Sequence, residues 1–373
     1  MKIRAAVLHQ AQSPLSLETL ELEPPRADEV LVRMVATGIC HTDIAMMSRP
    51  FPVNQPIVLG HEGAGVVEQV GAAVRQLQPG DRVVLSYNAC GHCSPCRSRA
   101  SSYCHYFLGS NFLGQRSDGS TALSQGGQPV RHRFFGQSSF ATHSLCTETN
   151  AVKVPTDVPD PLFQMLGPLG CGFITGAGAM VNVLKPSMGE AVAVFGSGAV
   201  GMAAIMAARA LGAHPIIAID RVATRLQTAL ELGASHVIDT LKTGDTLAAL
   251  QAIAPQGVQV TLDTTAASAV LRQALDALAP LGRCGFVGGA PLGTQLEVDV
   301  RDVMLKGKTL RGIVEGDAQP HVFIPTLIRM HQAGQFPFDR LVRFYDFEQI
   351  NQAIADARSG QTIKPIIRFH QGL

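Results

Sequence analysis

"AVAVFGSGAVGMAAIMAARALGAHPIIAID" (residues 191–220) predicts a strand, a glycine-rich turn, a helix and a second strand in close succession. Gly196, Gly198 and Gly201 form the pattern G-x-G-x-x-G directly after the first strand, and Asp220 ends the second. A lone glycine pattern of this kind is weak support for any function. Between a strand and a helix, with an acidic residue at the end of the next strand, it indicates a dinucleotide-binding unit.

The three glycines have separate physical roles in such a unit. Gly196 allows the tight turn, Gly198 lets the backbone approach a pyrophosphate, and Gly201 lets the helix pack closely on the strand. The amino end of the helix supplies amide groups and a partial positive charge. We therefore expect the pyrophosphate of a dinucleotide to bind at this turn.

The acidic residue after the second strand bears on the choice of cofactor. Asp220 is expected to accept hydrogen bonds from the adenosine ribose hydroxyls and to repel a 2'-phosphate, which favours NAD over NADP. Arg221 and Arg225 follow closely in the sequence and could instead attract that phosphate. We expect NAD as the cofactor.

Further strand and helix patterns follow this unit. Strand-like segments, separated by amphipathic stretches such as "TRLQTALELG", are "SHVIDT", "VQVTLDTT", "GRCGFVGGA" and "TLRGIVEG". Strands that alternate with helices predict a parallel sheet with helices on both faces, an α/β fold of the doubly wound type.

The composition and charge of the 373-residue chain exclude several classes of protein. Hydrophobic residues make up 46% of the chain and charged residues 16%, which is typical of a soluble globular protein. The formal net charge is +1 and no block of Lys or Arg occurs, so we expect no nucleic-acid partner.

Two long uncharged runs, residues 161–184 and 191–208, meet the length of a membrane span. Both are rich in glycine, and runs this apolar are also typical of buried parallel strands, so we expect no membrane insertion. The first residues, "MKIRAAVLHQAQSP", lack the apolar core of a signal peptide, and we therefore expect a cytoplasmic protein.

"CGHCSPCRSRASSYC" (residues 90–104) contains four of the eight cysteines. In a reducing compartment, cysteines so closely spaced favour metal ligands over disulfides, with redox or iron–sulfur use as the alternatives. Four thiolates would complete a tetrahedral zinc site and leave no position for a substrate, so the zinc would be structural. Its expected ligands are Cys90, Cys93, Cys96 and Cys104.

A second possible ligand set is spread along the chain, with Cys40 in "ATGICHTDIA", His61 in "GHEGAGVVEQVG" and Cys171 in "GPLGCGFITGAGAM". A lone histidine is more often a structural residue than a metal ligand. Together, two thiolates and one imidazole would leave the fourth position of a zinc ion free for water or substrate. Cys146 and Cys284 lie in apolar, strand-like stretches and are expected to be buried small hydrophobic residues.

From end to end, the chain resembles the zinc-containing medium-chain alcohol dehydrogenases, and within them the bacterial aryl-alcohol (benzyl alcohol) dehydrogenase branch. It is also similar to geraniol and other allylic alcohol dehydrogenases. The motifs that carry the resemblance are, in chain order, "TGICHTD", "GHEGAGVVEQVG", "GDRVVLSYNACGHCSPC", "FFGQSSFATHSL", "GPLGCGFITGAGAMVNVLKP" and "FGSGAVG".

The resemblance implies a split architecture. A β-rich, GroES-like catalytic domain would consist of residues 1–172 and 315–373, and a Rossmann domain of residues 173–314 would be inserted between these two segments. The resemblance also implies a homo-oligomer, either a dimer or a tetramer.

The resemblance further assigns roles at the zinc site. Thr42 matches a hydroxyl that hydrogen-bonds the substrate oxygen, and Asp43 matches a carboxylate that orients the zinc-binding histidine. Glu62 matches an acid behind the metal that can transiently bind it. The ligands of the catalytic zinc would be Cys40, His61 and Cys171, the set known for this family.

The cofactor contacts implied by the resemblance come from several segments of the chain. They are Thr175 at the nicotinamide, backbone groups of Val287, Ile313 and Glu315 at its carboxamide, His41 and Lys364 at the pyrophosphate, and Arg225 at the adenosine ribose. Val200, within the glycine pattern, completes the expected NAD site together with Gly196, Gly198, Gly201 and Asp220.

The chain departs from the better-known family pattern at two positions. Three residues after Thr42, where many members carry a relay histidine, this chain has Ala45, so water or another group must complete the proton transfer. His41 stands in place of the commoner arginine and is expected to hold the pyrophosphate less firmly.

The implied reaction is the reversible, NAD-linked oxidation of a primary aromatic or allylic alcohol to the aldehyde. Zinc would lower the pKa of a bound alcohol so that a zinc-bound alkoxide forms near neutral pH. Thr42 would take the hydroxyl proton and pass it on, and hydride would move to the nicotinamide. Cofactor and metals would thus be NAD and two zinc ions per chain.

The positions that match the substrate pocket of the family form an aromatic, uncharged wall. Such a wall suits benzylic, allylic or terpene alcohols, although these phenylalanines could equally be ordinary core residues. The expected pocket residues are Phe51, Ser86, Phe134 and Phe135, with Val287 nearby.

Other functions remain open from the sequence. Terpene alcohols such as geraniol or perillyl alcohol, and aliphatic ω-hydroxy alcohols, are alternative substrates. A glutathione-dependent formaldehyde dehydrogenase would need basic pocket groups for the glutathione carboxylates, and none is convincing. A zinc-bearing nucleic-acid binder is disfavoured by the charge, and a zinc-free quinone reductase by the Cys40, His61 and Cys171 set.

Overall fold

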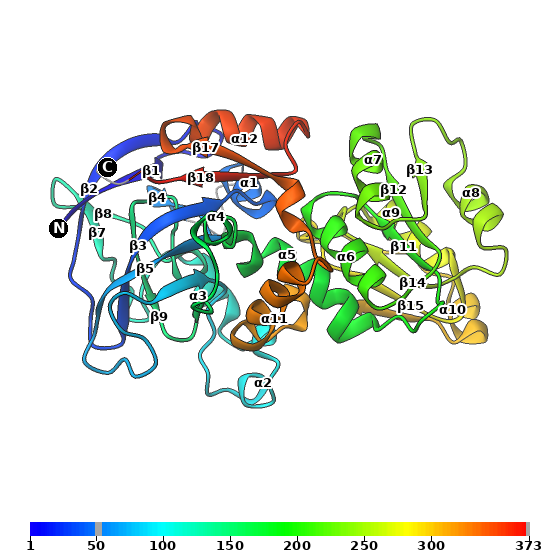
Figure 1. The fold of residues 1–373 in the computed structure, drawn as a ribbon, viewed down its shortest axis with the longest axis horizontal. Helices are drawn as coiled ribbons and strands as arrows, with labels where there is room; N and C mark the ends of the chain where they lie inside the picture. Colours follow the sequence, from blue (N-terminus) through cyan, green and yellow to red (C-terminus); the bar gives the residue numbers. More distant parts are fainter. Residues whose placement is uncertain (49–53, 371–373) are drawn as a thin grey trace. The chain divides into compact units, whose positions relative to one another are not determined.

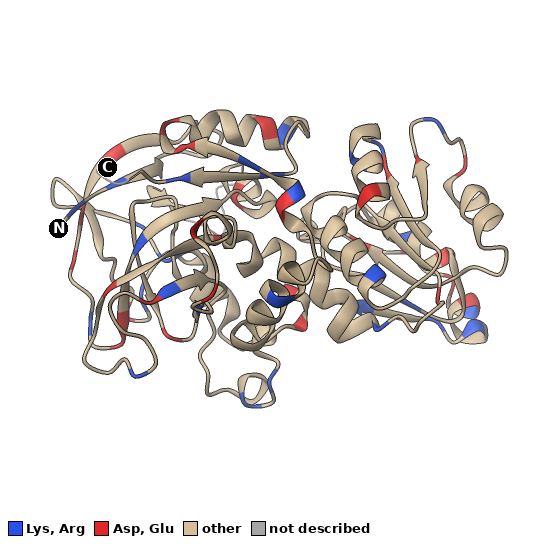
Figure 2. Cartoon of the chain, in the orientation of Figure 1, with Lys and Arg blue, Asp and Glu red and all other residues tan. Residues whose placement is uncertain are grey.

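The computed structural model describes residues 1–48 and 54–370, which form two compact units (Figure 1). The first unit comprises the described residues of Met1–Cys171, Gln319–Ile328 and Asp339–Leu373. The second comprises Gly172–Ala318 and Arg329–Phe338. Basic and acidic side chains are interspersed along both units (Figure 2).

The first unit contains an antiparallel sheet of five strands in the order β4-β1-β2-β7-β8. Side chains of neighbouring residues in a strand point to opposite faces. In β2, accordingly, Leu20 and Leu22 are buried while Glu21 between them is exposed. The strands are β1 (Lys2–Leu8), β2 (Ser16–Leu22), β4 (Ile57–Val58), β7 (Leu123–Gln125) and β8 (Gln128–Val130).

A second sheet of the first unit has the order β10-β6-β5-β3-β18-β17, and β9 also pairs with β3. The last strand of the chain lies antiparallel to β3, with Ile366 opposite Gly38, so the C-terminal segment reaches the end of β3. The strands are β3 (Glu29–Gly38), β5 (Gly63–Val70), β6 (Arg82–Leu85), β9 (His143–Thr147), β10 (Ala151–Lys153), β17 (Val342–Asp346) and β18 (Lys364–Arg368).

Short helices connect and cover these sheets. α12 buries Ile350, Ala353, Ile354 and Ala357, the spacing of one helix face, against the core formed by residues of both sheets. The helices are α1 (His41–Ser48), α2 (Ser94–Arg97), η1 (Ser101–Tyr103), α3 (Phe107–Phe112), η2 (Phe134–Gly136), α4 (Asp160–Phe163), η3 (Gly167–Gly170), η7 (Phe347–Gln349) and α12 (Ile350–Ser359). α11 (Pro320–Gln332) and η6 (Phe338–Leu341) contain residues of both units.

The second unit is built on a six-stranded sheet in the order β13-β12-β11-β14-β15-β16, in which every pairing is parallel. In chain order this is the arrangement 3-2-1-4-5-6 of a doubly wound Rossmann sheet, which confirms the predicted α/β fold. The strands are β11 (Val192–Phe195), β12 (Ile216–Asp220), β13 (His236–Asp239), β14 (Val258–Asp263), β15 (Leu278–Phe286) and β16 (Thr309–Gly312).

The second long apolar run of the sequence, residues 191–208, belongs to strand β11 and helix α6. β11 is completely buried, and α6 is buried from Gly201 to Ala208, so this run is the interior of a sheet and its covering helix. In the part of the chain that the structure describes, no helix has the length and apolarity needed to span a membrane. The helices are α5 (Gly172–Gly178), η4 (Ala179–Leu184), α6 (Ala199–Ala210), α7 (Ala223–Leu232), α8 (Thr246–Ile253), α9 (Ser268–Asp276), α10 (Val300–Lys306) and η5 (Glu315–Asp317).

Candidate functional site

The fold gathers two groups of possible metal ligands within the first unit. In each group the ligand atoms all lie within 4.8 Å of one another. The mixed cluster consists of Cys40, His61 and Cys171, and the four-cysteine cluster consists of Cys90, Cys93, Cys96 and Cys104. These are the two sets that the sequence singled out.

The mixed cluster is assembled from the ends of three elements. Cys40 lies between β3 and α1, His61 lies two residues before the start of β5, and Cys171 directly follows η3. His61 is completely buried and Cys171 nearly so. The chain positions are far apart, so the antiparallel pairing of β3 with β5 is what brings Cys40 and His61 together.

Asp43, in the first turn of α1, organises this cluster. Its Oδ1 atom lies 2.9 Å from Nδ1 of His61 and accepts the Gly60 amide at 3.0 Å, and its Oδ2 atom accepts the Cys40 amide at 3.0 Å. The same carboxylate therefore fixes two ligand segments and the ring of the histidine. Asp43 itself is completely buried.

A metal ion fits this arrangement. With Nδ1 of His61 occupied by Asp43, the other ring nitrogen, Nε2, is buried and has no hydrogen-bond partner. An orphaned buried nitrogen beside two cysteine sulfurs, with a carboxylate behind the ring, is what a zinc-binding histidine presents. A hydrogen bond from Cys171 holds the pKa of Cys40 well below its usual range, despite burial, so the thiolate form is favoured.

Two glycines allow Cys171 to reach its place. A Cβ atom on Gly167 would lie 2.1 Å from the carbonyl oxygen of Glu62, and one on Gly170 would lie 2.0 Å from that of Leu85. Any side chain at either position would therefore collide with backbone. η3 can deliver Cys171 between the start of β5 and the end of β6 only because both residues are glycine.

Glu62 forms a buried ion pair with Lys364. The Lys364 ammonium lies 2.9 Å and 2.8 Å from the two carboxylate oxygens and donates to the carbonyl of Ile39 at 3.2 Å. Burial raises the pKa of Glu62, and the nearby lysine opposes that effect. Because Lys364 is only 2% exposed, its expected contact with a pyrophosphate would require this pair to open.

Thr42, His41 and Ala45 lie on α1 beside the mixed cluster. The Thr42 hydroxyl oxygen is 3.8 Å from the Cys40 sulfur, and the residue is partly exposed. His41 is exposed at the start of the helix, and Ala45 packs against the hydrophobic core. The one hydroxyl that α1 places next to a cluster ligand is therefore that of Thr42.

An aromatic group packs against the histidine of the mixed cluster. Phe135 stacks on His61 with ring centroids 4.5 Å apart, and Phe134 meets the same ring edge-on at 5.4 Å. Ser86 is completely buried, and its hydroxyl donates to the Gly170 carbonyl at 2.6 Å. The fourth expected pocket residue, Phe51, lies outside the described residues.

The four-cysteine cluster has the dimensions of a tetrahedral thiolate site. Zinc–sulfur bonds of about 2.3 Å place the sulfurs of such a site about 3.8 Å apart. The sulfur of Cys96 lies 3.9 Å from that of Cys90 and 3.4 Å from that of Cys93, and Cys93 and Cys104 are 3.9 Å apart. These separations exceed the roughly 2 Å of a disulfide, and they fit a zinc ion.

The predicted dinucleotide turn has the expected backbone. Gly196 follows β11 with φ +92°, a conformation that residues with a side chain rarely adopt. A Cβ atom on Gly201 would lie 1.9 Å from the carbonyl oxygen of Gly196, whereas one on Gly198 would meet nothing within 4 Å. The turn therefore has open space at Gly198, where a pyrophosphate would approach, and Val200 follows on α6.

Asp220 ends β12 next to this turn. Its carboxylate accepts the Ser197 amide at 2.6 Å and the amides of Arg221 and Val222 at 2.7 and 2.9 Å. These bonds fix the carboxylate at the carboxyl edge of the sheet, where doubly wound folds bind nucleotides. Arg225 lies on α7, with its Nε atom buried and without a hydrogen-bond partner.

The residues expected at the nicotinamide also lie within the second unit. The Thr175 hydroxyl donates to the Glu315 carboxylate at 3.3 Å, so α5 and η5 are joined there. Val287 directly follows β15, and Ile313 directly follows β16. The ends of two neighbouring parallel strands thus place these two backbones at the same edge of the sheet.

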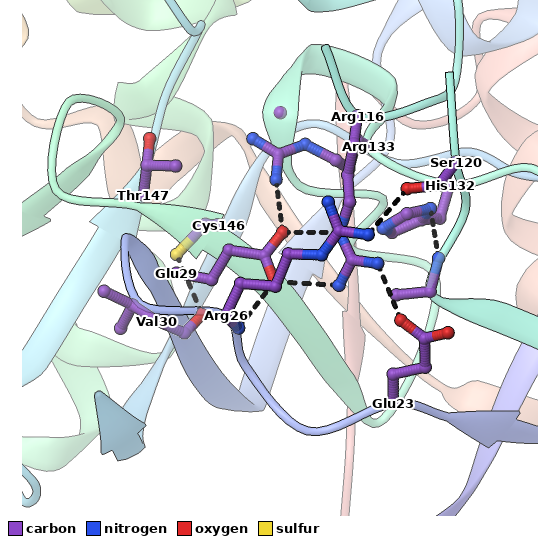
Figure 3. A network of polar contacts seen from close by, with 12 residues as sticks. Glu23, Arg26, Glu29, Val30, Arg116, Ser120, His132, Arg133, Cys146 and Thr147 are labelled. Atoms are coloured by element: carbon purple, nitrogen blue, oxygen red, sulfur yellow. Dashed lines mark hydrogen bonds and ion pairs between the residues drawn. The ribbon is translucent and has the colours of Figure 1, made fainter. Parts of the chain in front are cut away.

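A cavity of about 770 Å³ lies elsewhere in the first unit, lined in part by Tyr106, Arg116 and Arg133. Its lining residues include an ion cluster around buried Glu29, which Figure 3 shows. One carboxylate oxygen accepts from Arg116 and Arg133, each at 2.8 Å, and the other from Arg116 at 2.9 Å and the Arg26 amide at 3.0 Å. With both oxygens occupied by the protein, we assign the cluster a structural role.

Comparison with known proteins places the chain in a family. Residues 26–156 match the alcohol dehydrogenase GroES-like domain, and residues 199–332 match the zinc-binding dehydrogenase domain. A geraniol dehydrogenase of Castellaniella defragrans is 47% identical over 98% of this chain and 97% of its own length. The chain belongs to the zinc-containing medium-chain alcohol dehydrogenase family.

Solved structures of this alcohol dehydrogenase family agree with the assignment. The benzyl alcohol dehydrogenase of Acinetobacter calcoaceticus is 48% identical, with a TM-score of 0.95 over 99% of this chain and 100% of that one. An alcohol dehydrogenase zinc-binding domain protein of Burkholderia ambifaria is 52% identical, with a TM-score of 0.96 over the full length of both chains. The predicted family, its aryl-alcohol branch and the GroES-like and Rossmann fold are thereby confirmed.

Sequence reasoning missed one buried residue next to the mixed cluster. The side chain of Gln137 donates to the carbonyl of His61 and accepts the amide of Gly63. Gln137 lies on a loop within the motif "FFGQSSFATHSL", far in the sequence from Cys40, His61 and Cys171. Its place in a family motif was the one sign in the sequence that it matters, but the motif does not show that it binds the backbone of His61 and Gly63.

Proposed function

We propose that this alcohol dehydrogenase oxidises primary aromatic and allylic alcohols with NAD and holds two zinc ions per chain. The observation that carries the proposal is the mixed cluster, with its orphaned His61 nitrogen, in a chain that also contains a dinucleotide turn. The names of two relatives, a geraniol and a benzyl alcohol dehydrogenase, support the substrate class. Both names describe primary alcohols next to an unsaturated carbon.

Each of the two zinc ions would have its own set of ligands in the first unit. Cys40, His61 and Cys171 would bind the catalytic zinc, and the four-cysteine cluster would bind the structural one. When bound, zinc supplies a Lewis acid that lowers the pKa of an alcohol, and NAD supplies the hydride acceptor. Asp43 keeps His61 in the orientation that leaves Nε2 free for this purpose.

The proton of the alcohol requires an acceptor from the chain itself. Thr42 has its hydroxyl 3.8 Å from the Cys40 sulfur and is partly exposed, so we assign it this role. Ala45 has no group that could carry the proton further, and we propose that solvent completes the transfer. Phe134 and Phe135 are buried against His61, and they give this side of the site the apolar surroundings that suit an aromatic or allylic substrate.

The proposed preference for NAD rests on Asp220. A fixed carboxylate at the end of β12 disfavours the additional phosphate of NADP by charge repulsion, so kcat/KM should be on the order of a hundredfold higher with NAD. Asp220→Ser should reduce this ratio. Asp239, its paired residue on β13, offers a matched control, because Asp239→Ser alters an equivalent strand end outside the glycine turn.

The proposal is tested by steady-state oxidation of benzyl alcohol, geraniol, perillyl alcohol, an aliphatic ω-hydroxy alcohol and S-hydroxymethylglutathione, each with NAD. Ranked values of kcat/KM should place the benzylic and allylic alcohols first. If S-hydroxymethylglutathione ranks first, the chain is a formaldehyde dehydrogenase instead. If no alcohol is oxidised by protein that contains two zinc ions, the proposed reaction is wrong.

A further inference from the structure

Gln137 joins the segment of the ligand His61 to Ser86 at the end of β6. Its amide is 1% exposed, and its nitrogen donates to the carbonyls of His61 at 3.0 Å and Ser86 at 3.2 Å. Its oxygen accepts the amide of Gly63 at 3.1 Å. Both donor positions of the side chain are therefore used, and they join the His61 turn to the end of β6.

Ser86 continues this connection to the third ligand. Its hydroxyl donates to the carbonyl of Gly170 at 2.6 Å, and Gly170 directly precedes Cys171. The backbone of Ser86 is held in turn by Asn150, which accepts its amide at 2.8 Å and donates to its carbonyl at 3.3 Å. A continuous buried chain of hydrogen bonds thus runs from His61 through Gln137 and Ser86 to Gly170.

This chain of bonds acts where the backbone is already closely packed. Gly167 and Gly170 of η3 lie directly against the carbonyls of Glu62 and Leu85. Since Cys171 directly follows η3, a small shift of η3 also shifts Cys171 relative to His61. Metal–ligand distances in a well-formed site stay within about 0.2 Å of their standard values. The polar bridge therefore controls a separation to which metal binding is sensitive.

We propose that Gln137 and Ser86 are positioning residues, which set the spacing of His61 and Cys171 for the catalytic metal. This inference rests on the proposed function. The resemblance implies Ser86 at the substrate pocket, but its side chain is completely buried and its hydroxyl is bonded to the Gly170 carbonyl. The side chain of Gln137 is bonded to the backbone of His61 and Gly63, so each side chain acts through the backbone of a ligand segment. Loss of supporting hydrogen bonds around metal ligands lowers metal affinity or activity by about 10–100-fold, and we expect effects of this size.

The test compares zinc-loaded wild-type protein with Ser86→Ala and Gln137→Met. Zinc release to a chromogenic chelator should be biphasic in the wild type, and one phase should become at least about tenfold faster in each variant. Cobalt-substituted protein should show a shifted visible absorption spectrum in both variants, because the ligand geometry changes. Ser86→Thr keeps the hydroxyl and should restore the wild-type release rate and spectrum.

Thr121→Ala is the matched control. Its hydroxyl also donates to a backbone carbonyl, that of Val130 at 2.5 Å, and neither residue lies in a segment that carries a ligand of the mixed cluster. Thr121→Ala should lower the melting temperature without altering zinc release or the cobalt spectrum. If Ser86→Ala and the control variant changed the rate of zinc release and the cobalt spectrum equally, Ser86 would act only by stabilising the fold. That result would overturn the inference.

Two further outcomes separate this inference from the proposed function. If wild-type protein holds two zinc ions and oxidises alcohols, but Ser86→Ala and Gln137→Met release zinc at the wild-type rate, the positioning role is wrong and the function stands. If the wild type holds a single zinc, bound by the four-cysteine cluster alone, the catalytic site and the inference are both wrong.

Discussion

Thr42 is the residue on which the proposed proton transfer depends. Its hydroxyl is the group that α1 places beside Cys40, so Thr42→Val should lower kcat/KM for benzyl alcohol at least about 100-fold, the usual scale for a positioned proton acceptor. Thr42→Ser keeps the hydroxyl and should retain most of the activity. Steady-state rates from mildly acidic to alkaline pH measure both effects.

Ala45→His serves as the companion variant for this proton transfer. It should change little at alkaline pH, where hydroxide accepts the proton, and should accelerate a proton-limited step near neutrality. If Thr42→Val oxidises its best alcohol at the wild-type rate, the proton leaves by another route.

Single residues also show where sequence reasoning ends. The ligands of the mixed cluster were found because cysteine and histidine are uncommon and chemically distinctive. The Glu62–Lys364 pair and the contacts of Gln137 were not, because their partners lie far away in the chain and are common residue types. Lys364 was predicted at the pyrophosphate from the resemblance alone, whereas its buried pairing with Glu62 depends on how β18 aligns with β3.

At the scale of elements, the four-cysteine cluster holds together a segment with little regular structure. α2 has only four residues, none of them buried, so it lacks a hydrophobic core of its own. The free energy of binding a structural zinc is part of the folding free energy of such a segment. Cys96→Ser should therefore lower the zinc content by about one per chain and lower the melting temperature.

Cys146→Ala controls for the loss of a cysteine as such, because Cys146 is buried in β9 and belongs to neither cluster. It should keep the full zinc content, as measured by atomic absorption. Wild-type zinc content and melting temperature in Cys96→Ser would contradict the structural role of the cluster.

The ion cluster around Glu29 joins the start of β3 to the segments that carry Arg116 and Arg133 (Figure 3). Burial raises the pKa of Glu29, but hydrogen bonds and charge from Arg116 outweigh it and bring the pKa below its ordinary value of 4.5. The stabilisation is thus complete above that pH and is lost as the pH falls below it. Glu29→Gln should cost about 3 kcal/mol of unfolding free energy at neutral pH.

In Glu29→Gln, the free energy of unfolding should also fall less between neutral pH and about pH 4 than it does in the wild type. Urea unfolding at several pH values measures this difference. Glu348→Gln is the control, because its ion pair with Arg4 is exposed and should contribute less than about 1 kcal/mol. If both variants lost the same free energy of unfolding, the buried cluster would contribute no more to stability than an exposed ion pair.

Elements differed in how far the sequence could predict them. Strands of the Rossmann sheet such as β11 and β12 were predictable because they are short apolar runs on either side of a helix, and the glycine turn fixed their type. The sheets of the first unit contain very short strands, such as the two residues of β4, whose pairing is set by distant partners. Only the resemblance to a family could anticipate them.

At the scale of the whole molecule, we propose that the chain self-associates through an exposed edge of the parallel sheet. All residues of β16, at the edge of the parallel sheet, are exposed, and nearby α10 exposes Val300, Met304 and Leu305 by 74%, 68% and 69%. An exposed edge strand beside apolar side chains is suited to pairing with a second copy. Light scattering should show an oligomer, and Leu310→Lys on β16 should shift it towards monomer.

Arg311→Glu is not a suitable control for that experiment, because Arg311 pairs with Asp317. Leu241→Lys is suitable, since Leu241 is 76% exposed in a turn after β13, at the opposite edge of the sheet. It should leave the oligomer unchanged. A monomeric wild type at micromolar concentration would contradict the proposed self-association.

The central claim is that Cys40, His61 and Cys171 hold a catalytic metal that is separate from the structural one. Its most direct test is the zinc content of Cys171→Ser, measured on the same samples as its rate of benzyl alcohol oxidation and its melting temperature. We predict about one zinc per chain instead of two, a largely preserved melting temperature, and a loss of activity of at least about a thousandfold. Two zinc ions per chain, or oxidation at the wild-type rate, would contradict the account.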